Sequence, residues 1–272
     1  MTKHTILQGD AAAHMADYDD ETIDTVVTSP PYNLGVDYGS TVSDKMSRFD
    51  YVNKFSVEWM EQVMRLLRPD GHFFLNLGAS PSDPMLPYQL LAKAAEMGWK
   101  LQNTIHWIKS ITFDDKAGNK VTRGHFKPIN SQRFLNDSHE FVFHLTKDGA
   151  RPIHRKAEGV GVPYSDPSNV SRWEHTGGDN LRCGGNNWLI PYVTINSTRL
   201  QRPHPATFPV ELATRCLLLA GKPKVVLDPF VGIGSTSLAA AECEAEWAIG
   251  IDLCAEYATE AAYRLNTRAH FA

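Results

Sequence analysis

Short apolar runs alternate with amphipathic segments along most of the chain. Seven mainly apolar runs, most of them bounded by Gly, Pro or Asp, have the length of strands that are covered on both faces. These runs are His4–Leu7, Ile23–Thr28, His72–Leu77, Leu101–Ile108, His139–Leu145, Lys224–Asp228 and Trp247–Asp252. Apolar residues at i, i+3 and i+4 spacing predict helices at Tyr51–Leu67, Leu86–Glu96, Val210–Ala220, Ser235–Cys243 and Ala255–Asn266. This alternation predicts a doubly wound α/β fold with a mixed, mainly parallel seven-stranded sheet.

Two long stretches interrupt the alternation. Ser110–Asn136 has little periodicity, and Thr146–Pro203 is rich in Gly, Pro, Asn and Trp. Loops of that length inside a compact domain usually bind ligands or cover a site. We therefore expect residues 1–145 and 204–272 to form one domain, and residues 146–203 to form an insert in it.

Charge is distributed unevenly along the chain. The net charge of −4 is mildly unfavourable for a nucleic-acid partner. Residues 100–203, however, carry 15 Lys and Arg against 9 Asp and Glu, whereas the remaining residues carry 12 against 22. A middle segment with a net charge of +6 suits an element that contacts phosphates, although an ordinary solvated surface would give the same count.

Cysteine usage and hydropathy exclude several classes of protein. The four cysteines form no C-x-x-C pair, which indicates reduced core thiols and gives no reason to expect a metal site. Apolar runs such as Cys216–Ala220 are far too short to span a bilayer, and the first residues lack the apolar region of a signal peptide. We expect a cytoplasmic protein without membrane contact.

A Gly-rich segment near the C-terminus has the pattern of a strand, a tight turn and the start of a helix. Gly232 and Gly234 would let the backbone turn sharply and approach a ligand closely. Ser235 and Thr236 would then open the helix and expose its free N–H groups. The next strand ends in Asp252, in a position where a carboxylate can bind a ribose diol.

This turn differs in two ways from a dinucleotide-binding turn. Ser237 stands where the third Gly of G-x-G-x-x-G would be, and the charge of Asp228 would repel a pyrophosphate. An acidic strand end instead suits a cofactor with an ammonium group, such as the methionine moiety of S-adenosylmethionine. A cap and tight turn that binds no ligand is the structural alternative.

A second candidate site, Ser29-Pro30-Pro31-Tyr32, follows the run Ile23–Thr28 directly. The two prolines fix the backbone as it leaves the sheet, and their carbonyl groups stay free to accept hydrogen bonds. Ser29 Oγ and the Pro30 carbonyl could both accept from an amino group, while the Tyr32 ring could stack on a planar base. An exocyclic amine is a poor nucleophile, so an enzyme helps by positioning it. A base of a duplex would have to flip out, at a cost of about a few kcal/mol. A purely structural Pro-Pro turn is the alternative.

Together the two elements resemble those of the amino-group DNA methyltransferases, specifically the permuted class labelled β. The resemblance covers nearly the whole chain, because Leu7–Asp10, Leu67–Gly71, Ser138–His144 and His204–Pro209 look like further motifs in the family's order. It implies a circularly permuted, Rossmann-like methyltransferase fold in which S-adenosylmethionine is the cofactor. The implied catalytic residues are Ser29, Pro30, Pro31 and Tyr32. The implied cofactor-binding residues are Asp10, Thr28, Phe208, Asp228, Pro229, Phe230, Gly232, Gly234, Ser235, Thr236 and Asp252.

The resemblance also implies double-stranded DNA as the partner and residues 146–203 as the target-recognition insert. Candidate DNA contacts in the insert are Lys147, Arg151, Arg155, Lys156, Arg172, Trp173, Arg182 and Trp188. Arg and Lys suit phosphate or guanine contacts, whereas Trp could stack on a base or only pack the insert. Dimers are frequent in this class, and a cognate restriction endonuclease would be a genetic rather than a physical partner.

Two features favour cytosine N4 over adenine N6 as the methylated amine. Ser29 stands where adenine-specific members of the family commonly carry Asp or Asn, and His204–Pro209 matches His-Pro-Ala-x-Phe-Pro, which cytosine-specific members often have rather than the Lys-Pro ending. Methylation of adenine N6 remains the alternative. A nicotinamide-dependent oxidoreductase would leave Ser29–Tyr32 unexplained, a protein-amide methyltransferase typically has Asn before Pro-Pro-Tyr, and a non-catalytic DNA-binding module would need no adenosine pocket.

Overall fold

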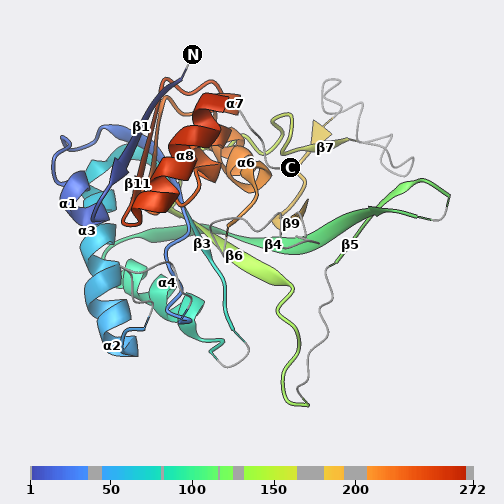
Figure 1. Cartoon of the computed structure of the whole chain (residues 1–272), viewed down its shortest axis with the longest axis horizontal. Helices are drawn as coiled ribbons and strands as arrows, with labels where there is room; N and C mark the ends of the chain where they lie inside the picture. Colours follow the sequence, from blue (N-terminus) through green and yellow to red (C-terminus); the bar gives the residue numbers. More distant parts are fainter. Residues whose placement is uncertain are drawn as a thin grey trace.

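A computed structural model of the chain describes residues 2–35, 45–80, 83–115, 117–124, 132–163, 181–192 and 207–267. Within these residues, a nine-stranded sheet has the order β1-β11-β10-β2-β3-β6-β4-β5, and β9 also pairs with β4 (Figure 1). Its strands are β1 (Lys3–Gln8), β2 (Ile23–Thr28), β3 (Leu67–Leu77), β4 (Lys100–Asp114), β5 (Lys120–Gly124), β6 (His139–Thr146), β9 (Asn187–Pro191), β10 (Val225–Asp228) and β11 (Trp247–Asp252). A separate two-stranded ladder joins β7 (Val162–Pro163) and β8 (Leu181–Arg182).

One edge of the sheet collects the ends of strands that are far apart in the sequence. β1, β11, β10, β2 and β3 are parallel, so their carboxyl ends lie at the same edge. β6 is antiparallel to β3, and β4 is antiparallel to β6. The amino end of β6 and the carboxyl-terminal part of β4 therefore reach this edge too, which we call the carboxyl edge.

Helices cover both faces of the sheet, because neighbouring residues of a strand point to opposite sides. On β3, Phe73 and Leu75 pack in one core with α1 (Ala11–Met15), α3 (Ser56–Leu66) and α4 (Leu86–Glu96). Phe74 packs in a second core with α6 (Val210–Ala220) and α7 (Ser235–Glu242). The remaining helical elements are α2 (Arg48–Asp50), a π-helical turn at Tyr51–Phe55 that leads into α3, and α8 (Ala255–Thr267).

The periodic segments form the expected elements. The seven predicted strands lie next to one another as β1-β11-β10-β2-β3-β6-β4, and β2, β11, α4 and α6 have the predicted bounds. β1 pairs in parallel with β11, so it occupies the position that would follow α8 in an unpermuted chain. None of the described helices combines the length and the apolar character needed to cross a bilayer. The four cysteines form no disulfide, and three of them are buried.

The structure adds strands where the sequence predicts loops. β4 continues to Asp114 and pairs with β5, so part of the predicted loop 110–136 is a hairpin that projects from the body of the molecule (Figure 1). Asp115 closes its turn, since Asp115 Oδ1 accepts hydrogen bonds from the main-chain N–H groups of Ala117 and Asn119. β9 comes from the predicted insert and pairs in parallel with β4. Both strands are short or half polar, which is why periodicity alone does not reveal them.

Candidate functional site

Two clusters of polar side chains meet at the carboxyl edge. One surrounds the Gly-rich turn between β10 and α7, and the other surrounds Ser29–Tyr32 after β2. β10 and β2 are adjacent parallel strands, so their carboxyl ends bring the two clusters together. The carboxyl ends of adjacent parallel strands are where open α/β sheets bind their ligands.

Asp228 connects the two clusters. Its carboxylate is 1 % exposed and accepts hydrogen bonds from the Thr28 hydroxyl (2.6 Å), the Thr236 hydroxyl (2.6 Å) and the main-chain N–H of Phe230 (3.0 Å). Burial raises the pKa of Asp228 to about 6, although the hydrogen bonds act in the opposite direction. Asp228 therefore holds the end of β2 against the start of α7.

The Gly-rich turn is held in a backbone conformation that glycine favours. Gly232 and Gly234 have φ angles of +50° and +88°. A Cβ atom at Gly234 would lie 3.2 Å from the Cβ of Ala261, so α8 packs closely against the turn. Asp252 Oδ2 accepts a 2.9 Å hydrogen bond from the Gly232 N–H, and burial raises the pKa of Asp252. The turn and its acidic neighbour are thus fixed relative to each other.

The other predicted cofactor residues also lie around this edge. Asp10 follows β1, is exposed, and caps α1 by accepting from the Ala13 N–H at 2.8 Å. Ser235 donates to the Phe208 carbonyl at 2.9 Å, and the Phe230 ring packs edge-on against Trp59 at 5.2 Å between centroids. Pro229, Gly232, Gly234 and Thr236 are buried in the turn and the first turn of α7.

The second cluster contains Ser29, Tyr32 and a residue of β3, Asn76. Ser29 Oγ and the Tyr32 hydroxyl lie 2.7 Å apart. Asn76 Nδ2 lies 2.9 Å from the Tyr32 hydroxyl and 3.3 Å from Ser29 Oγ. Tyr51 donates a hydrogen bond to the Pro31 carbonyl, so the π-helical turn before α3 braces the Pro-Pro segment from the other side. These contacts give Ser29–Tyr32 one defined position at the end of β2.

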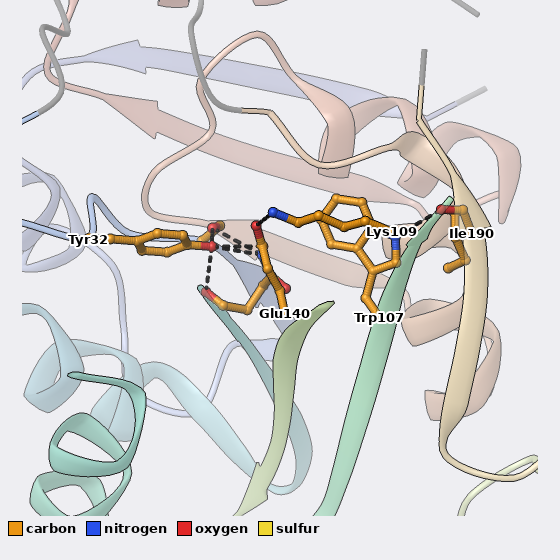
Figure 2. Close-up of polar contacts among 7 residues, drawn as sticks. Tyr32, Trp107, Lys109, Glu140 and Ile190 are labelled. Atoms are coloured by element: carbon orange, nitrogen blue, oxygen red, sulfur yellow. Dashed lines mark hydrogen bonds and ion pairs between the residues drawn. The ribbon is translucent and has the colours of Figure 1, made fainter. Parts of the chain in front are cut away.

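Glu140, the second residue of β6, completes this cluster (Figure 2). Its Oε2 accepts from Asn76 Nδ2 at 2.6 Å and from the Tyr32 hydroxyl at 3.1 Å. Its Oε1 pairs with Lys109 Nζ on β4 at 2.7 Å. The Lys109 ammonium lies 5.7 Å from the Trp107 ring centroid, and the indole N–H of Trp107 donates to the carbonyl of Ile190 in β9 at 3.0 Å. Contacts therefore continue from β2 across β3, β6 and β4 to β9.

Asn76, Glu140 and Lys109 are not among the residues predicted from the sequence. One signal is visible in hindsight, because Asn76 is a single amide in the buried apolar run of β3. A buried polar side chain needs hydrogen-bond partners, and residues that supply them tend to form networks. The partners themselves come from other strands, so only the sheet order reveals them.

Gly78, which follows β3, leaves space for this cluster. A Cβ atom at that position would lie 2.8 Å from Tyr32 Cε2 and 3.3 Å from Glu140 Oε1. The first distance is shorter than any ordinary carbon–carbon contact. The Tyr32 ring can therefore lie against the β3 backbone only because residue 78 has no side chain.

The structure does not bring several predicted DNA contacts to the carboxyl edge. β6 starts at this edge near Glu140 and ends at Thr146, about 20 Å away along the strand. Lys147 and Arg151 follow it at the opposite edge, where Arg151 pairs with Asp148. Arg155 and Lys156 lie at that edge as well, because the adjacent His154 N–H donates to the carbonyl of Leu219 near the end of α6.

The remaining predictions for the insert have different outcomes. Arg182 belongs to β8 and is paired with Val162 of β7. Trp188 is only 5 % exposed and lies in the second core, so it packs the insert and is not available for stacking on a base. Arg172, Trp173 and residues 204–206 lie outside the described residues. Lys109 on β4 and Lys120 and Arg123 on the hairpin strand β5 do lie at or beyond the carboxyl edge.

Comparisons with known proteins agree with this geometry. A family model described as DNA methylase of the N6/N4 type matches residues 23–263. The type II methyltransferase M.HpaI of Haemophilus parainfluenzae is 27 % identical over 264 residues, which cover 96 % of this chain and 74 % of the relative. The type II methyltransferase M.SmaI of Serratia marcescens is 28 % identical over 298 residues, with 97 % of this chain and 91 % of the relative covered.

Solved structures share the fold. The cytosine-N4-specific PvuII DNA methyltransferase superposes with a TM-score of 0.68 at 20 % identity, and the match covers 97 % of this chain and 86 % of the PvuII enzyme. The M1.HpyAVI–SAM complex superposes with a TM-score of 0.58 at 20 % identity, with 97 % and 99 % covered. The mixed sheet with helices on both faces is therefore a methyltransferase fold.

Proposed function

This chain belongs to the N6/N4 family of DNA methylases, and on that basis we propose that it methylates the N4 amino group of a cytosine that is flipped out of duplex DNA. Membership makes it a DNA methyltransferase that acts on an exocyclic amine with S-adenosylmethionine as cofactor. Beyond family membership, we propose that the methylated base is cytosine, and we propose the roles of the individual residues.

The Gly-rich turn fits this cofactor. The positive φ angles of Gly232 and Gly234 give the sharp turn that a bound adenosine requires, and we assign Asp252, which accepts from the Gly232 N–H, to the hydroxyl groups of the ribose. The buried charge of Asp228 favours a cationic ligand and disfavours a pyrophosphate, which separates this turn from that of a nicotinamide-dependent enzyme. When bound, S-adenosylmethionine supplies an electrophilic methyl group.

The observation that carries the proposal is the 2.6 Å hydrogen bond from the Thr28 hydroxyl to Asp228. It joins the cofactor turn to the residue directly before Ser29. The Ser29 Oγ atom and the Pro30 carbonyl then accept the two hydrogens of the amine, which turns the nitrogen lone pair toward the methyl donor. Because a paired base cannot present its amine in this way, the base must flip out.

Ser29 is also the basis for proposing cytosine. In the resemblance on which the assignment rests, Ser before Pro-Pro-Tyr accompanies cytosine N4 methylation, whereas Asp or Asn accompanies adenine N6 methylation. The hydroxyl, the carboxylate and the amide all supply an oxygen acceptor, so hydrogen-bond chemistry alone does not separate the two bases.

We further propose that DNA approaches the carboxyl edge. The β4–β5 hairpin carries Lys109, Lys120 and Arg123 there, and β9 ends beside it. Residues 146–203 are the proposed recognition segment, and Arg172 and Trp173 keep their predicted DNA contacts. The proposed DNA contacts do not include Lys147, Arg151, Arg155 and Lys156. A duplex bound at the carboxyl edge would have to wrap around the sheet to reach them.

The test is to identify the product. Plasmid DNA is incubated with the purified protein and S-adenosylmethionine, digested to nucleosides and analysed by mass spectrometry, with Ser29→Ala as the inactive control. We expect N4-methyldeoxycytidine. N6-methyldeoxyadenosine alone would replace the target base, and tight binding of NAD with no binding of S-adenosylmethionine would overturn the assignment of the cofactor turn.

A further inference from the structure

A hydroxyl group can face an amine in two ways. It can present a lone pair, which accepts a hydrogen from the amine, or it can present its own hydrogen, which opposes the hydrogens of the amine. In the proposed reaction Ser29 Oγ must present a lone pair. The hydrogen of Ser29 must therefore be donated to another group, and the neighbouring acceptor is the Tyr32 oxygen at 2.7 Å.

The contacts of Tyr32 decide whether its oxygen can accept that hydrogen. Tyr32 has to donate its own hydrogen elsewhere, and the acceptors described near it include Glu140 Oε2 at 3.1 Å and the main-chain oxygen of Asn76 at 3.5 Å. The carboxylate is both closer and charged, and hydrogen bonds to charged acceptors are the stronger ones. Tyr32 therefore donates to Glu140.

The contacts of Glu140 make it act only as a hydrogen-bond acceptor. A carboxylate can only accept hydrogen bonds. Lys109 occupies Oε1 at 2.7 Å, which leaves Oε2 to Tyr32 and to the amide of Asn76. The Glu140 side chain is 12 % exposed, so water competes little for these positions. Lys109, Asn76 and Tyr32 therefore all donate to Glu140. Because Tyr32 donates to Glu140, its oxygen is left to accept the hydrogen of Ser29.

We propose that Glu140 is a positioning residue that sets this direction, Ser29 to Tyr32 to Glu140, and so turns the lone pair of Ser29 toward the amine of the target base. The inference rests on the proposed function and adds a residue to it. If Glu140 could donate, the chain could reverse. Tyr32 would then donate to Ser29, and the Ser29 hydrogen would face the amine.

The test variant is Glu140→Gln, which keeps the shape of the side chain but gives it an amide that can donate to Tyr32. We expect the single-turnover rate of methyl transfer to fall about 10- to 100-fold, as when one oriented hydrogen bond to a reacting group is lost. The dissociation constant for S-adenosylmethionine should stay unchanged, whereas the melting temperature should fall somewhat, because Lys109 and Asn76 lose a charged acceptor. Glu96→Gln is the matched control, because Glu96 is also paired with a lysine, Lys93, at 2.6 Å but lies on α4.

A double-mutant cycle separates this role from a merely structural one. Tyr32→Phe removes the central link, so it should lower the rate by a similar factor on its own. In the Tyr32→Phe background, Glu140→Gln should then cause no further loss, whereas the Glu140 effect would persist there if it acted by another route. A persistent effect overturns the inference, and so does full activity of Tyr32→Phe, which can be judged even if Glu140→Gln does not fold.

The outcomes also separate the inference from the function on which it rests. If the wild-type protein methylates DNA and Glu140→Gln is equally fast, only the role of Glu140 is overturned. If the wild-type protein transfers no methyl group to any DNA amine, the proposed function fails, and the role of Glu140 fails with it.

Discussion

The hydroxyl of Thr28 donates a 2.6 Å hydrogen bond to the carboxylate of Asp228, although 200 positions separate the two residues in the sequence. Both residues are buried, and each ends a strand at the carboxyl edge. A shift of one strand end therefore shifts the other. This bond and the pairing of β2 with β10 together set the distance between the Gly-rich turn and Ser29–Tyr32.

Thr28→Val should destabilise the protein and slow methyl transfer. Valine has nearly the shape of threonine, so the main loss is one donor to a buried carboxylate, worth about 1–3 kcal/mol. Thr25→Val is the matched control, because Thr25 lies on the same strand, is fully buried, and its hydroxyl has no hydrogen-bond partner among the described residues. Denaturant unfolding of the two variants checks this, and an equal loss from both would show that the Thr28 hydroxyl contributes nothing special.

Asp228→Asn should weaken the binding of S-adenosylmethionine and alter how stability depends on pH. Burial raises the pKa of Asp228 in the folded protein to about 6, from the 3.8 that is ordinary for an aspartate. The raised carboxyl pKa on its own contributes a loss of stability of up to roughly 3 kcal/mol as the pH rises from about 4 to about 6, and this opposes the larger gain that His72 and His144 contribute over the same window. The asparagine variant lacks this loss. Its melting temperature relative to the wild type should therefore increase across that window and stay level above it.

Thermal unfolding between pH 4 and pH 7.5 measures that difference, and calorimetric titration at neutral pH measures cofactor affinity. The substitution need not break hydrogen bonds. The new amide nitrogen can donate to the Thr236 hydroxyl, because that hydroxyl lies 3.2 Å from the Val27 carbonyl and can donate its own hydrogen there. A pH-independent difference in melting temperature would show that Asp228 is not a destabilised buried charge. Unchanged cofactor affinity would show that its charge does not reach the ligand.

The sequence alone predicts those parts of the fold whose signal is local. β2 and α6 have the predicted bounds because a strand period of 2 and a helix period of 3.6 are visible in short windows. β9 has only five residues, and it becomes a strand because β4 offers it a free ladder of hydrogen-bonding groups. That reason lies in tertiary structure, so no pattern within Asn187–Pro191 expresses it.

The same division applies to the site. Ser29–Tyr32 and the Gly-rich turn are contiguous motifs and could be found directly. Asn76, Glu140 and Lys109 come from three strands, and only the order β3-β6-β4 makes them neighbours. The excess of basic residues between positions 100 and 203 is real, yet a charge count contains no information about the two edges of a sheet. For this reason the sequence could identify Lys147 and Arg151 as basic residues of the insert but could not show that they lie at the edge opposite the site.

Gly78→Ala should slow methyl transfer while cofactor affinity is retained. The added methyl group would lie 2.8 Å from the Tyr32 ring, so the ring has to move away from Ser29 and Glu140. We expect a loss of at least about tenfold in the single-turnover rate, because a small displacement of a positioning group is costly. A rate equal to that of the wild type would show that Tyr32 can shift without effect on the reaction.

Arg123→Gln should weaken DNA binding, whereas Arg155→Gln should leave it nearly unchanged. Arg123 lies on the hairpin beyond the carboxyl edge, and Arg155 lies at the opposite edge of the sheet. If Arg123 contacts a phosphate, its loss should also reduce the slope of log affinity against log salt by about 1. Titrations of labelled duplex DNA at several salt concentrations measure both effects. The reverse ranking of the two variants would place the duplex on the other edge.

The stability of the fold should fall as the pH is lowered from about 6.5 to about 4, because of a buried pair of histidines. His72 Nδ1 lies 2.9 Å from His144 Nε2, and Asn103 Nδ2 lies 3.0 Å from His144 Nδ1. An amide nitrogen only donates, so His144 Nδ1 must accept, and His144 Nε2 then donates to His72. Both rings are therefore neutral in the folded protein.

Burial lowers the pKa of His72 to about 4 and that of His144 to about 3. In the unfolded chain both rings bind a proton near pH 6.5, whereas in the folded chain they stay neutral until the pH is much lower. The unfolded state then binds more protons, so the free energy of unfolding decreases with falling pH, by up to about 3 kcal/mol per histidine. His72→Gln removes one of the two groups and should make this dependence roughly half as steep. Urea unfolding at pH 7, 6, 5 and 4.5 measures the slope, and an unchanged slope in the variant would show that the acid sensitivity arises elsewhere.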